Sequence, residues 1–345
     1  MAAPIPARPR PSRFMIAGAS SLRGKELKQL LEASSLPIED LRLLDEEFAA
    51  GTLTEAAGEP TIIQPVDEES FQGARLVFFT GSPAFARRHL PVARRMGATV
   101  IDLSDGLRAA PAARVWIPVL DKLLPPPPPV PGASEGGEVY ISPSAAGIVG
   151  CILAAALAPL SVRRLATVFF QPVSECGDKG IDELESQTVK LLSFQPIAQE
   201  VFDTQVAFNM LSRYGDSSHE RLSDSRAAIA ACLRIYLDGR VPMPAVQLVH
   251  APVFYAAAFS AFAEFDPALQ PADLGSALET AGVRLTASGD APPSNLSAAG
   301  STDITLARIE RDPNLPGGFW LWGAVDNFRL PAANAISIAE RLLAS

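Results

Sequence analysis

The chain has 345 residues, of which 48% are hydrophobic and 19% charged, so it can bury a substantial core and is long enough for roughly two domains. Its formal net charge of −9 argues against nucleic acid or an anionic membrane as a partner, because both attract an excess of Lys and Arg. Its three cysteines form no Cys-x-x-Cys pair and have no His at ligand spacing, which predicts no disulfide framework and no metal site.

The N-terminal residues 1–12 contain Pro and Arg but lack the apolar segment of a targeting signal, so we expect a disordered tail. The longest apolar run, residues 145–160, is short for a membrane span and contains Pro159. Together with the unpaired cysteines, these features predict a cytoplasmic protein that has no membrane partner.

Residues 13–143 alternate short apolar runs with segments of helical spacing. The first run ends at Gly18, and Leu27, Leu30 and Leu31 follow it on one face of an expected helix. Strands alternating with helices predict a parallel α/β sheet. The expected strands are 13–18, 41–44, 75–79 and 98–102, and the expected helices are 25–34 and 84–96.

A run of five prolines, residues 125–129, lies in a linker at 124–137 and predicts an exposed polyproline II segment. Longer apolar strands follow in residues 144–325, which predicts a second, α+β domain with a mixed or antiparallel sheet. The final residues 326–345 include a helix that is expected to pack back on the first domain. The expected strands are 165–170, 245–250 and 256–265, and the expected helices are 178–192, 223–236 and 332–343.

The turn after the first strand has glycines at its two outer positions, Gly18 and Gly24, but Ser21 in the middle. A Rossmann turn uses three glycines, and the middle one lets a pyrophosphate approach the backbone. The side chain of Ser21 crowds that place, so we expect binding of NAD or NADP to be weak or absent. Two glycines alone are also compatible with a strand–helix packing turn that binds no ligand.

Four motifs along the chain resemble those of the aspartate-semialdehyde dehydrogenase family. Within that family, Phe208-Asn-Met-Leu211 and Pro252-Val-Phe-Tyr255 are similar to a diverged, Usg-like group that lacks the catalytic cysteine. The resemblance implies that residues 13–143 form a Rossmann-type NAD(P)-binding domain and residues 144–325 a dimerisation domain, and that the protein is a two-fold homodimer. The four motifs are Gly18-Ala-Ser-Ser-Leu-Arg-Gly24, Ile101-Asp-Leu-Ser104, Phe208-Asn209 and Asp326-Asn327.

The resemblance also implies that the two main catalytic groups are missing. The family motif Asn-Pro-Asn-Cys, which supplies the thiolate nucleophile, is matched by Ser142-Pro143-Ser144-Ala145. The position of the general base is matched by Ala257, and His250 stands where the family has the arginine that holds the substrate carboxylate. Gln171 keeps the family glutamine. A methyl group cannot form a thioester or accept a proton.

Further positions follow from the same resemblance. Arg108 matches the arginine that contacts phosphate, and the loop at Gly81 matches the loop that covers the nicotinamide. Acids replace the segment that grips the 2′-phosphate of NADP, so Asp45 or Glu46 could accept a ribose hydroxyl of NAD instead, or simply form a solvated loop. The implied cofactor positions are Gly18, Ser20, Ser21, Leu22, Gly24, Asp45, Gly81 and Asn327.

Two residues could have taken over the chemistry. Cys176 lies close to Gln171 in sequence and could act as a relocated nucleophile, with His250 as its base. Glu175 beside it would oppose formation of a thiolate, and Cys151 lies in an apolar helical run typical of a core thiol. The register near Asp224 leaves open whether this acid replaces the family glutamate for the substrate amine.

The leading hypothesis is therefore a dimeric binding or scaffolding protein of this family that lacks its activity, with a small molecule or another protein as partner. The alternative is an NAD(P)-dependent semialdehyde dehydrogenase with rearranged catalytic residues. A third hypothesis is a regulator that responds to NAD. Fold alone does not choose among them.

Overall fold

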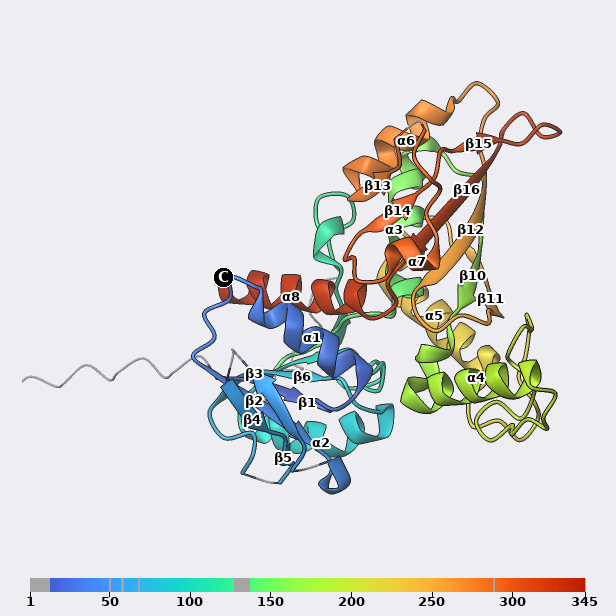
Figure 1. Ribbon diagram of the computed structural model, residues 1–345. Coiled ribbons are helices and arrows are strands. Elements are labelled where there is room, and N and C mark those ends of the chain that lie inside the picture. Colours follow the sequence, from blue (N-terminus) through green and yellow to red (C-terminus); the bar gives the residue numbers. More distant parts are fainter. Residues whose placement is uncertain are drawn as a thin grey trace, which may run out of the picture.

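The computed structural model describes residues 13–49, 51–56, 59–67, 69–126, 137–287 and 289–344. The expected N-terminal tail and most of the proline-rich linker lie outside these residues. The described chain forms two lobes, and the C-terminal helix lies across their junction (Figure 1).

The first lobe is built on a seven-stranded sheet in the order β5-β2-β1-β6-β7-β9-β8, and all six of its strand pairs are parallel. A separate antiparallel hairpin, β3–β4, was not predicted from the sequence. The strands are β1 (Arg13–Ala17), β2 (Asp40–Asp45), β3 (Leu53–Ala56), β4 (Glu59–Ile62), β5 (Gln64–Pro65), β6 (Ala74–Phe79), β7 (Thr99–Asp102), β8 (Ala113–Val115) and β9 (Val139–Ile141).

The central strands of this sheet carry apolar side chains on both faces, and helices cover both faces and bury them. In β1, Phe14 and Ile16 pack on one face with Leu27 and Ile338, whereas Met15 packs on the other. The helix α1 (Leu22–Glu32) lies on the first face and α2 (Pro83–Arg95) on the second (Figure 1). Two 3₁₀ turns, η1 (Glu47–Ala49) and η2 (Pro118–Leu120), complete the lobe.

The second lobe contains a mixed sheet in the order β11-β10-β12-β16-β14-β13, with β15 paired to β16. Strand β10 is parallel to β11 and antiparallel to β12. The parallel sheet and the mixed sheet confirm the predicted fold class. The strands are β10 (Arg164–Gln171), β11 (Ala245–His250), β12 (Ala257–Glu264), β13 (Val283–Leu285), β14 (Ile304–Leu306), β15 (Glu310–Arg311) and β16 (Gly318–Val325).

The helices of this lobe include one that is buried along almost its whole length. This helix, α3 (Ala145–Leu157), begins directly after β9 and packs against α5, α6 and β10. Its burial explains the long apolar run in the sequence, which is too short to cross a membrane. The other helices are α4 (Gly177–Leu192), α5 (Leu222–Leu237), α6 (Pro271–Thr280) and α7 (Asn295–Ala298), with the 3₁₀ turns η3 (Ala158–Leu160) and η4 (Val173–Cys176).

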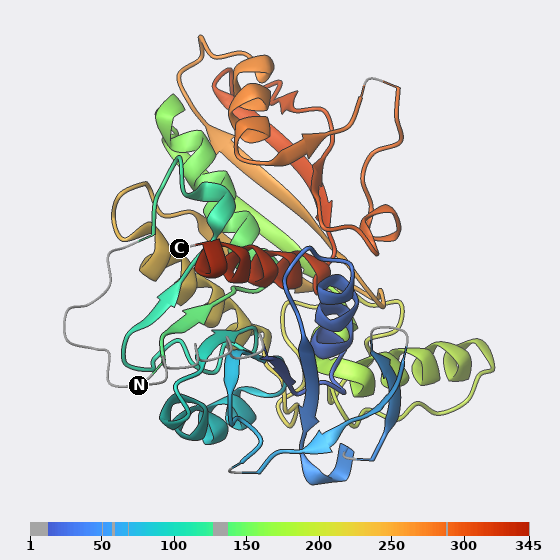
Figure 2. The same cartoon turned by 90° about the vertical axis from the view of Figure 1, so that its left-hand side faces the viewer.

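The last helix, α8 (Arg329–Ala344), leaves the second sheet and packs on α1 of the first lobe. Figure 2 shows it between the two lobes. At its start, Arg329 Nε lies 2.7 Å from Glu26 Oε2 of α1. Further along, Asn334 Nδ2 donates to Trp116 O and to Ser142 Oγ, each at 3.0 Å. The helix therefore joins elements from both ends of the chain.

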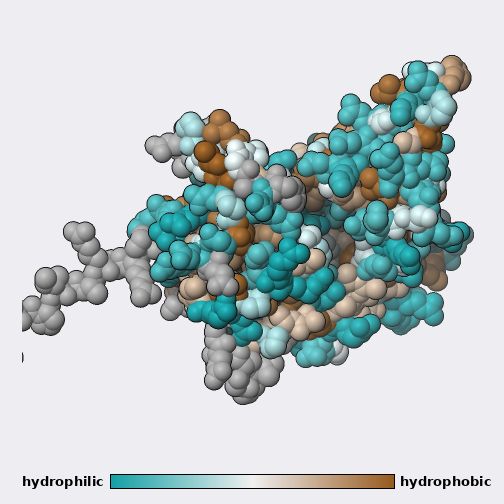
Figure 3. Space-filling view, turned by 90° about the horizontal axis from the view of Figure 1, so that it is seen from below, coloured by the Kyte–Doolittle hydropathy of each residue, from teal (hydrophilic) through white to brown (hydrophobic). Residues whose placement is uncertain are grey.

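Hydrophilic residues cover most of the face seen from below, with apolar residues scattered among them (Figure 3). Polar and charged residues are expected at the surface of a folded chain, because burying them is unfavourable.

The tightest backbone contact of the first lobe lies at Gly18, directly after β1. Gly18 has φ of +97°, and a Cβ built there would collide with the backbone amide of Gly81. We expect Gly18→Ala to lower the free energy of unfolding by about 3 kcal/mol, because backbone strain and overpacking add. Chemical denaturation measures this loss.

Gly97 provides the matched control, since it also has positive φ, +74°, but has no atom within 4 Å of the added Cβ. Gly97→Ala should cost about 1 kcal/mol from strain alone. Equal losses in the two variants would show that the contact with Gly81 does not constrain the fold.

Candidate functional site

A cavity of about 510 Å³ lies where the two lobes meet. The first lobe contributes the turn after β1 and the loops after β2, β6 and β7. The second lobe contributes the N-terminus of α3, the end of β10, the turn η4, the first turns of α5 and the start of β12. Carboxyl ends of parallel strands meet at this edge, which is where α/β sheets bind ligands.

The glycine turn is hydrogen-bonded largely to itself and to β2. The amides of Gly18 and Ala19 donate to Leu44 O, and that of Ser21 donates to Gly18 O. The Ser21 hydroxyl caps α1: it accepts from Gly24 N at 3.0 Å and lies 2.7 Å from Gly18 O. The turn therefore offers an anion only the amides of Leu22 and Arg23, at the first two positions of α1.

Asp45, the expected acceptor for a ribose hydroxyl, is also occupied by the protein. Its Oδ2 accepts from Ser20 N at 2.7 Å and from Ser20 Oγ at 2.6 Å, and its Oδ1 accepts from Glu46 N at 2.8 Å. Ser20, Ser21 and Asp45 line the cavity, but their polar atoms already have protein partners. Leu22 is not part of the cavity wall.

The other two expected cofactor positions, Gly81 and Asn327, both line the cavity. The Asn327 amide is used in full: its Oδ1 accepts from Ala256 N at 3.0 Å, and its Nδ2 donates to Glu175 Oε1 at 3.0 Å. Ala256 has φ of +60°, so this hydrogen bond holds a strained residue just before β12. The role of Asn327 in the structure is thus to fix the turn η4 and the start of β12.

Three of the four positions that the resemblance links to catalysis lie together on the cavity wall. Ala145 is the first residue of α3, behind the N-cap Ser144; Gln171 ends β10, and Ala257 begins β12. Ala145 and Ala257 are 2% and 7% exposed, so their methyl groups are packed. Neither side chain can donate, accept or transfer a proton.

The fourth position, His250, is fully buried and does not line the cavity. Its Nδ1 lies 3.4 Å from Tyr214 Oη and its Nε2 lies 3.3 Å from Val206 O. Burial lowers the pKa of His250, so the imidazole is neutral at pH 7. It connects the end of β11 to residues 206–214, and Tyr214 rather than His250 reaches the cavity.

Cys176 lies on the cavity wall, immediately before α4. Its pKa is raised well above the ordinary value, first by burial and then by Glu220, Glu175 and Glu183. The position ahead of a helix would favour a thiolate, but burial and three carboxylates outweigh it. Cys176 is therefore a protonated thiol.

The other two cysteines are buried between α3 and α5. Burial, and then the neighbouring Cys232, raises the pKa of Cys151 well above the ordinary range. Cys151 is therefore a core thiol, as its apolar run indicates.

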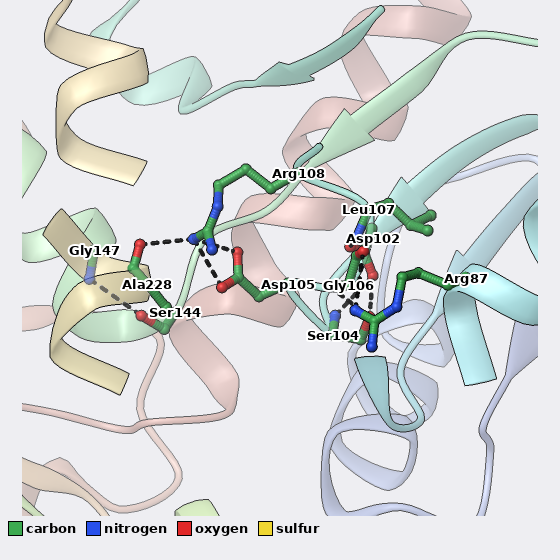
Figure 4. Close-up of polar contacts among 10 residues, drawn as sticks. All are labelled: Arg87, Asp102, Ser104, Asp105, Gly106, Leu107, Arg108, Ser144, Gly147 and Ala228. Carbon is green, nitrogen blue, oxygen red and sulfur yellow. Dashed lines mark hydrogen bonds and ion pairs between the residues drawn. The ribbon is translucent and has the colours of Figure 1, made fainter. Parts of the chain in front are cut away.

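Arg108, the expected phosphate ligand, is engaged by protein groups (Figure 4). Its Nη1 lies 2.8 Å from Asp105 Oδ2 and 2.6 Å from Ala228 O of α5. Asp105 lines the cavity, but Arg108 does not. The buried Asp102, at the end of β7, fixes this loop by accepting from Ser104 N and Leu107 N, each at 2.9 Å. Arg108 thus connects the two lobes.

The charges on the wall are predominantly negative. Asp45, Glu46, Asp105, Glu175 and Glu220 line it, against two arginines, Arg23 and Arg221. Burial raises the pKa of Glu220. A wall of this sign disfavours the pyrophosphate of a dinucleotide.

Sequence reasoning missed several wall residues, among them Arg23, Tyr214 and Glu220. Arg23 lies inside the glycine motif and could have been noticed there, and its guanidinium is 3.7 Å from Glu175 Oε2. Tyr214 and Glu220 come from an irregular segment between α4 and α5, where no periodicity predicts which side chains point inward.

Comparison with known proteins identifies the family and the fold of the chain. Residues 13–125 match the family description "Semialdehyde dehydrogenase, NAD binding domain", and residues 153–330 match "Semialdehyde dehydrogenase, dimerisation domain". The chain belongs to the semialdehyde dehydrogenase family. The resemblance found in its motifs is confirmed.

Its relatives include two proteins named "USG-1 protein homolog". The one from Azotobacter vinelandii is 31% identical over 95% of this chain and 96% of the relative. The one from Pseudomonas aeruginosa is 30% identical over 97% of this chain and 98% of the relative. The structure of a probable aspartate-semialdehyde dehydrogenase from Pseudomonas aeruginosa is similar with a TM-score of 0.84 and 28% identity, over 96% of this chain and 98% of that one.

Within the described residues, no helix is long and apolar enough to cross a membrane. No group of three or more His, Cys, Asp or Glu residues in that part of the chain is arranged to hold a metal ion.

The ion pair between Asp105 and Arg108 generates a prediction about pH. Burial raises the pKa of Asp105 from 3.8 to about 6, despite Arg108 beside it. The pKa of Asp105 is thus higher in the folded than in the unfolded state. Its contribution to the free energy of unfolding is therefore complete below pH 3.8, and it is lost as pH rises through about 6. In Asp105→Asn, this fall of about 1 kcal/mol between pH 4 and pH 7 should be absent, the magnitude being reduced by partial exposure.

Denaturant unfolding at several pH values measures the free energy of unfolding of the unaltered protein and of Asp105→Asn, and the two are compared at each pH. Because asparagine does not titrate, the curves of the two proteins should differ in slope between pH 4 and pH 7 by the contribution of Asp105. Parallel curves over this range would contradict the assignment.

Proposed function

We propose that this protein is a homodimeric member of the semialdehyde dehydrogenase family that lacks the family's dehydrogenase activity and serves as a binding or scaffolding protein in the cytoplasm. The observation that carries the proposal is the pair Ala145 and Ala257 on the wall of one cavity, beside Gln171. On the family's pattern these two positions supply the nucleophile and the base. Loss of one member of such a set already removes most of the rate, and the loss of a second adds little.

A chemical argument supports the proposal independently of the motif matches. Oxidation through a thioester requires a thiolate within reach of the aldehyde and a base to receive a proton. The two thiols on the described wall are Cys176, whose pKa is raised, and Cys232, which is buried. The imidazole of His250 is buried beneath Tyr214.

Dinucleotide binding is proposed to be weak or absent. The chain carries the NAD-binding domain of its family, and the solved aspartate-semialdehyde dehydrogenase from Candida albicans contains NADP. In this chain the glycine turn is hydrogen-bonded to its own neighbours, Asp45 is held by Ser20, and the wall is acidic. When bound, a dinucleotide would supply hydride acceptance; no residue here is assigned a step through it.

The deciding experiment is a phosphate-dependent assay with aspartate semialdehyde and NAD or NADP, together with calorimetric titration of each dinucleotide. We expect no turnover above the uncatalysed rate and no saturable binding up to about 1 mM dinucleotide, where any binding free energy would be weaker than about −4 kcal/mol. The double variant Ala145→Cys/Ala257→His restores the nucleophile and the base of the family pattern, and it tests whether the fold of this chain can still support dehydrogenase activity. Turnover by the unaltered chain would sink the proposal.

The rival function, a dehydrogenase with rearranged residues, is favoured by one observation: Cys176 lies on the same wall as Gln171. Its raised pKa predicts slow alkylation by iodoacetamide at pH 7.5 compared with a cysteine peptide. Glu175→Gln should speed the reaction and Cys232→Ser should not change it. Fast alkylation of the unaltered protein, or activity that Cys176→Ser abolishes, would establish the rival.

The proposal that the chain forms a homodimer rests on the second sheet. Side chains alternate along β10, β12 and β16, so that one face packs on α3 while the other presents Trp320 and Trp322, which are 45% and 39% exposed. Phe170 and Phe262 contact these indoles with ring centroids 6.0 and 5.0 Å apart. A contiguous aromatic surface of this kind is typical of protein–protein interfaces.

We expect Trp322→Asp to convert the dimer to a monomer, because it places a charge at the centre of an apolar interface. Sedimentation velocity measures the state. Leu53→Asp is the control, because this substitution also replaces an exposed apolar side chain by a carboxylate but lies on the hairpin of the first lobe. Leu53 is 70% exposed there. A dimer that survives Trp322→Asp, or an unaltered chain that is monomeric, would contradict this assignment.

A further inference from the structure

A second cavity, of about 320 Å³, lies at the N-terminus of α5. It is bounded by residues 212–216, by the start of α5 and by β11 at the edge of the second sheet. Tyr214, Arg221 and Leu248 also line the large cavity, so the two spaces are neighbours. Its distinguishing feature is its charge, because three arginines and one aspartate line it in a chain that is acidic overall.

Two of these arginines have no carboxylate partner in the part of the chain that the structure describes. Arg213 forms an exposed ion pair with Asp216, at 3.7 Å. Arg221 and Arg226 are both exposed, and no carboxylate oxygen of the described residues lies within ion-pairing distance of either. Arg226 instead donates to the neutral amide oxygen of Gln247, at 2.7 Å. This hydrogen bond orients the guanidinium beside the cavity and leaves its charge uncompensated.

The position of these arginines opposes the ordinary electrostatics of a helix. Arg221 is the N-cap residue of α5, and its side chain makes no capping hydrogen bond. Arg226 lies within the first turn and a half, and helical side chains lean toward the N-terminus. The helix dipole is positive at this end and favours anions there, so cations destabilise it. Asp224 is the acid of the first turn, but it does not line the cavity.

Cations at the N-terminus of a helix that have no acidic partner are unfavourable for the fold, and such unfavourable arrangements are typical of binding sites. Two guanidinium groups supply forks of N–H donors that match the oxygens of phosphate. The first two amides of α5, at Leu222 and Ser223, have no intrahelical acceptor and lie at the same end. A doubly charged oxyanion would satisfy all of these groups, whereas a single carboxylate carries half the charge.

We propose that this second cavity binds a phosphate group, either inorganic phosphate or the phosphate of a small ester, through Arg221 and Arg226 at the N-terminus of α5. The site is separate from Arg108, whose guanidinium is held by Asp105 and Ala228. It does not rest on the proposed function, since an active or an inactive dehydrogenase could carry it.

The test is calorimetric titration of the full-length protein with inorganic phosphate and with glycerol 3-phosphate, in a buffer of low ionic strength that contains no other polyvalent anion. We expect one saturable site per chain. Arg221→Gln and Arg226→Gln should each weaken binding about tenfold or more, because each removes a charge-assisted hydrogen bond. Tighter binding of the ester than of inorganic phosphate would show that the cavity takes the ester, and equal binding that it takes the phosphate alone.

Two controls locate the site. Arg234→Gln changes the net charge equally on the same helix, one turn from its end, and should leave binding unchanged. Arg23→Gln changes an arginine that lines only the large cavity and should also leave it unchanged. The unliganded variants at Arg221 and Arg226 should melt no lower than the unaltered chain, because each removes a cation from the positive end of a helix.

Three results would overturn the proposal. Absence of saturable heat with both ligands is the first. The second is an equal loss of affinity in Arg234→Gln, which would show that only net charge matters, or a loss confined to Arg23→Gln, which would place the phosphate in the large cavity. The third is lower melting of the unliganded Arg221 and Arg226 variants, which would make these arginines structural.

Discussion

The contact between Gly18 and Gly81 determines the shape of the cavity between the lobes. Two backbone segments, the turn after β1 and the loop after β6, touch there without a side chain between them. Because they touch, the Ser21 hydroxyl reaches both Gly18 O and Thr80 O while capping α1. The first turn of α1 and its Arg23 are thereby held at the edge of the cavity. The glycines that resemble a phosphate-binding motif thus serve the packing of strand, loop and helix.

The polar groups around the cavity are satisfied mainly by one another. Asp45 is matched by Ser20, Asn327 by Glu175 and Ala256, and Arg108 by Asp105 and α5. Buried polar groups need partners, and groups that find them within the protein give up little on remaining unliganded. The fold of the family is retained here, but polar groups around the cavity are hydrogen-bonded to other groups of the protein. The second cavity differs, because two of its three arginines, Arg221 and Arg226, lack acidic partners among the described residues.

Sequence periodicity predicted both sheets, because central strands and amphipathic helices leave strong patterns of apolar residues. It missed the hairpin β3–β4 and the short strands β5, β8, β9, β13, β14 and β15, which have two to four residues each and too little length for a pattern. It also missed the eight-residue strand β16. The alanines at 145 and 257 were found through motifs and lie on the wall of the cavity. The burial of His250 and the pairing of Arg108 depend on segments distant in sequence, residues 206–214 and α5, which no local pattern reveals.

The return of α8 to the first lobe has a consequence for biosynthesis. Its residues Ala332, Ala335 and Ile338 complete the core on the face of the parallel sheet that α1 covers. A ribosome releases the first 143 residues long before it releases these, so that face stays partly uncovered while the second lobe is made. The N-terminal lobe therefore reaches its final core only after the second lobe and α8 have been translated.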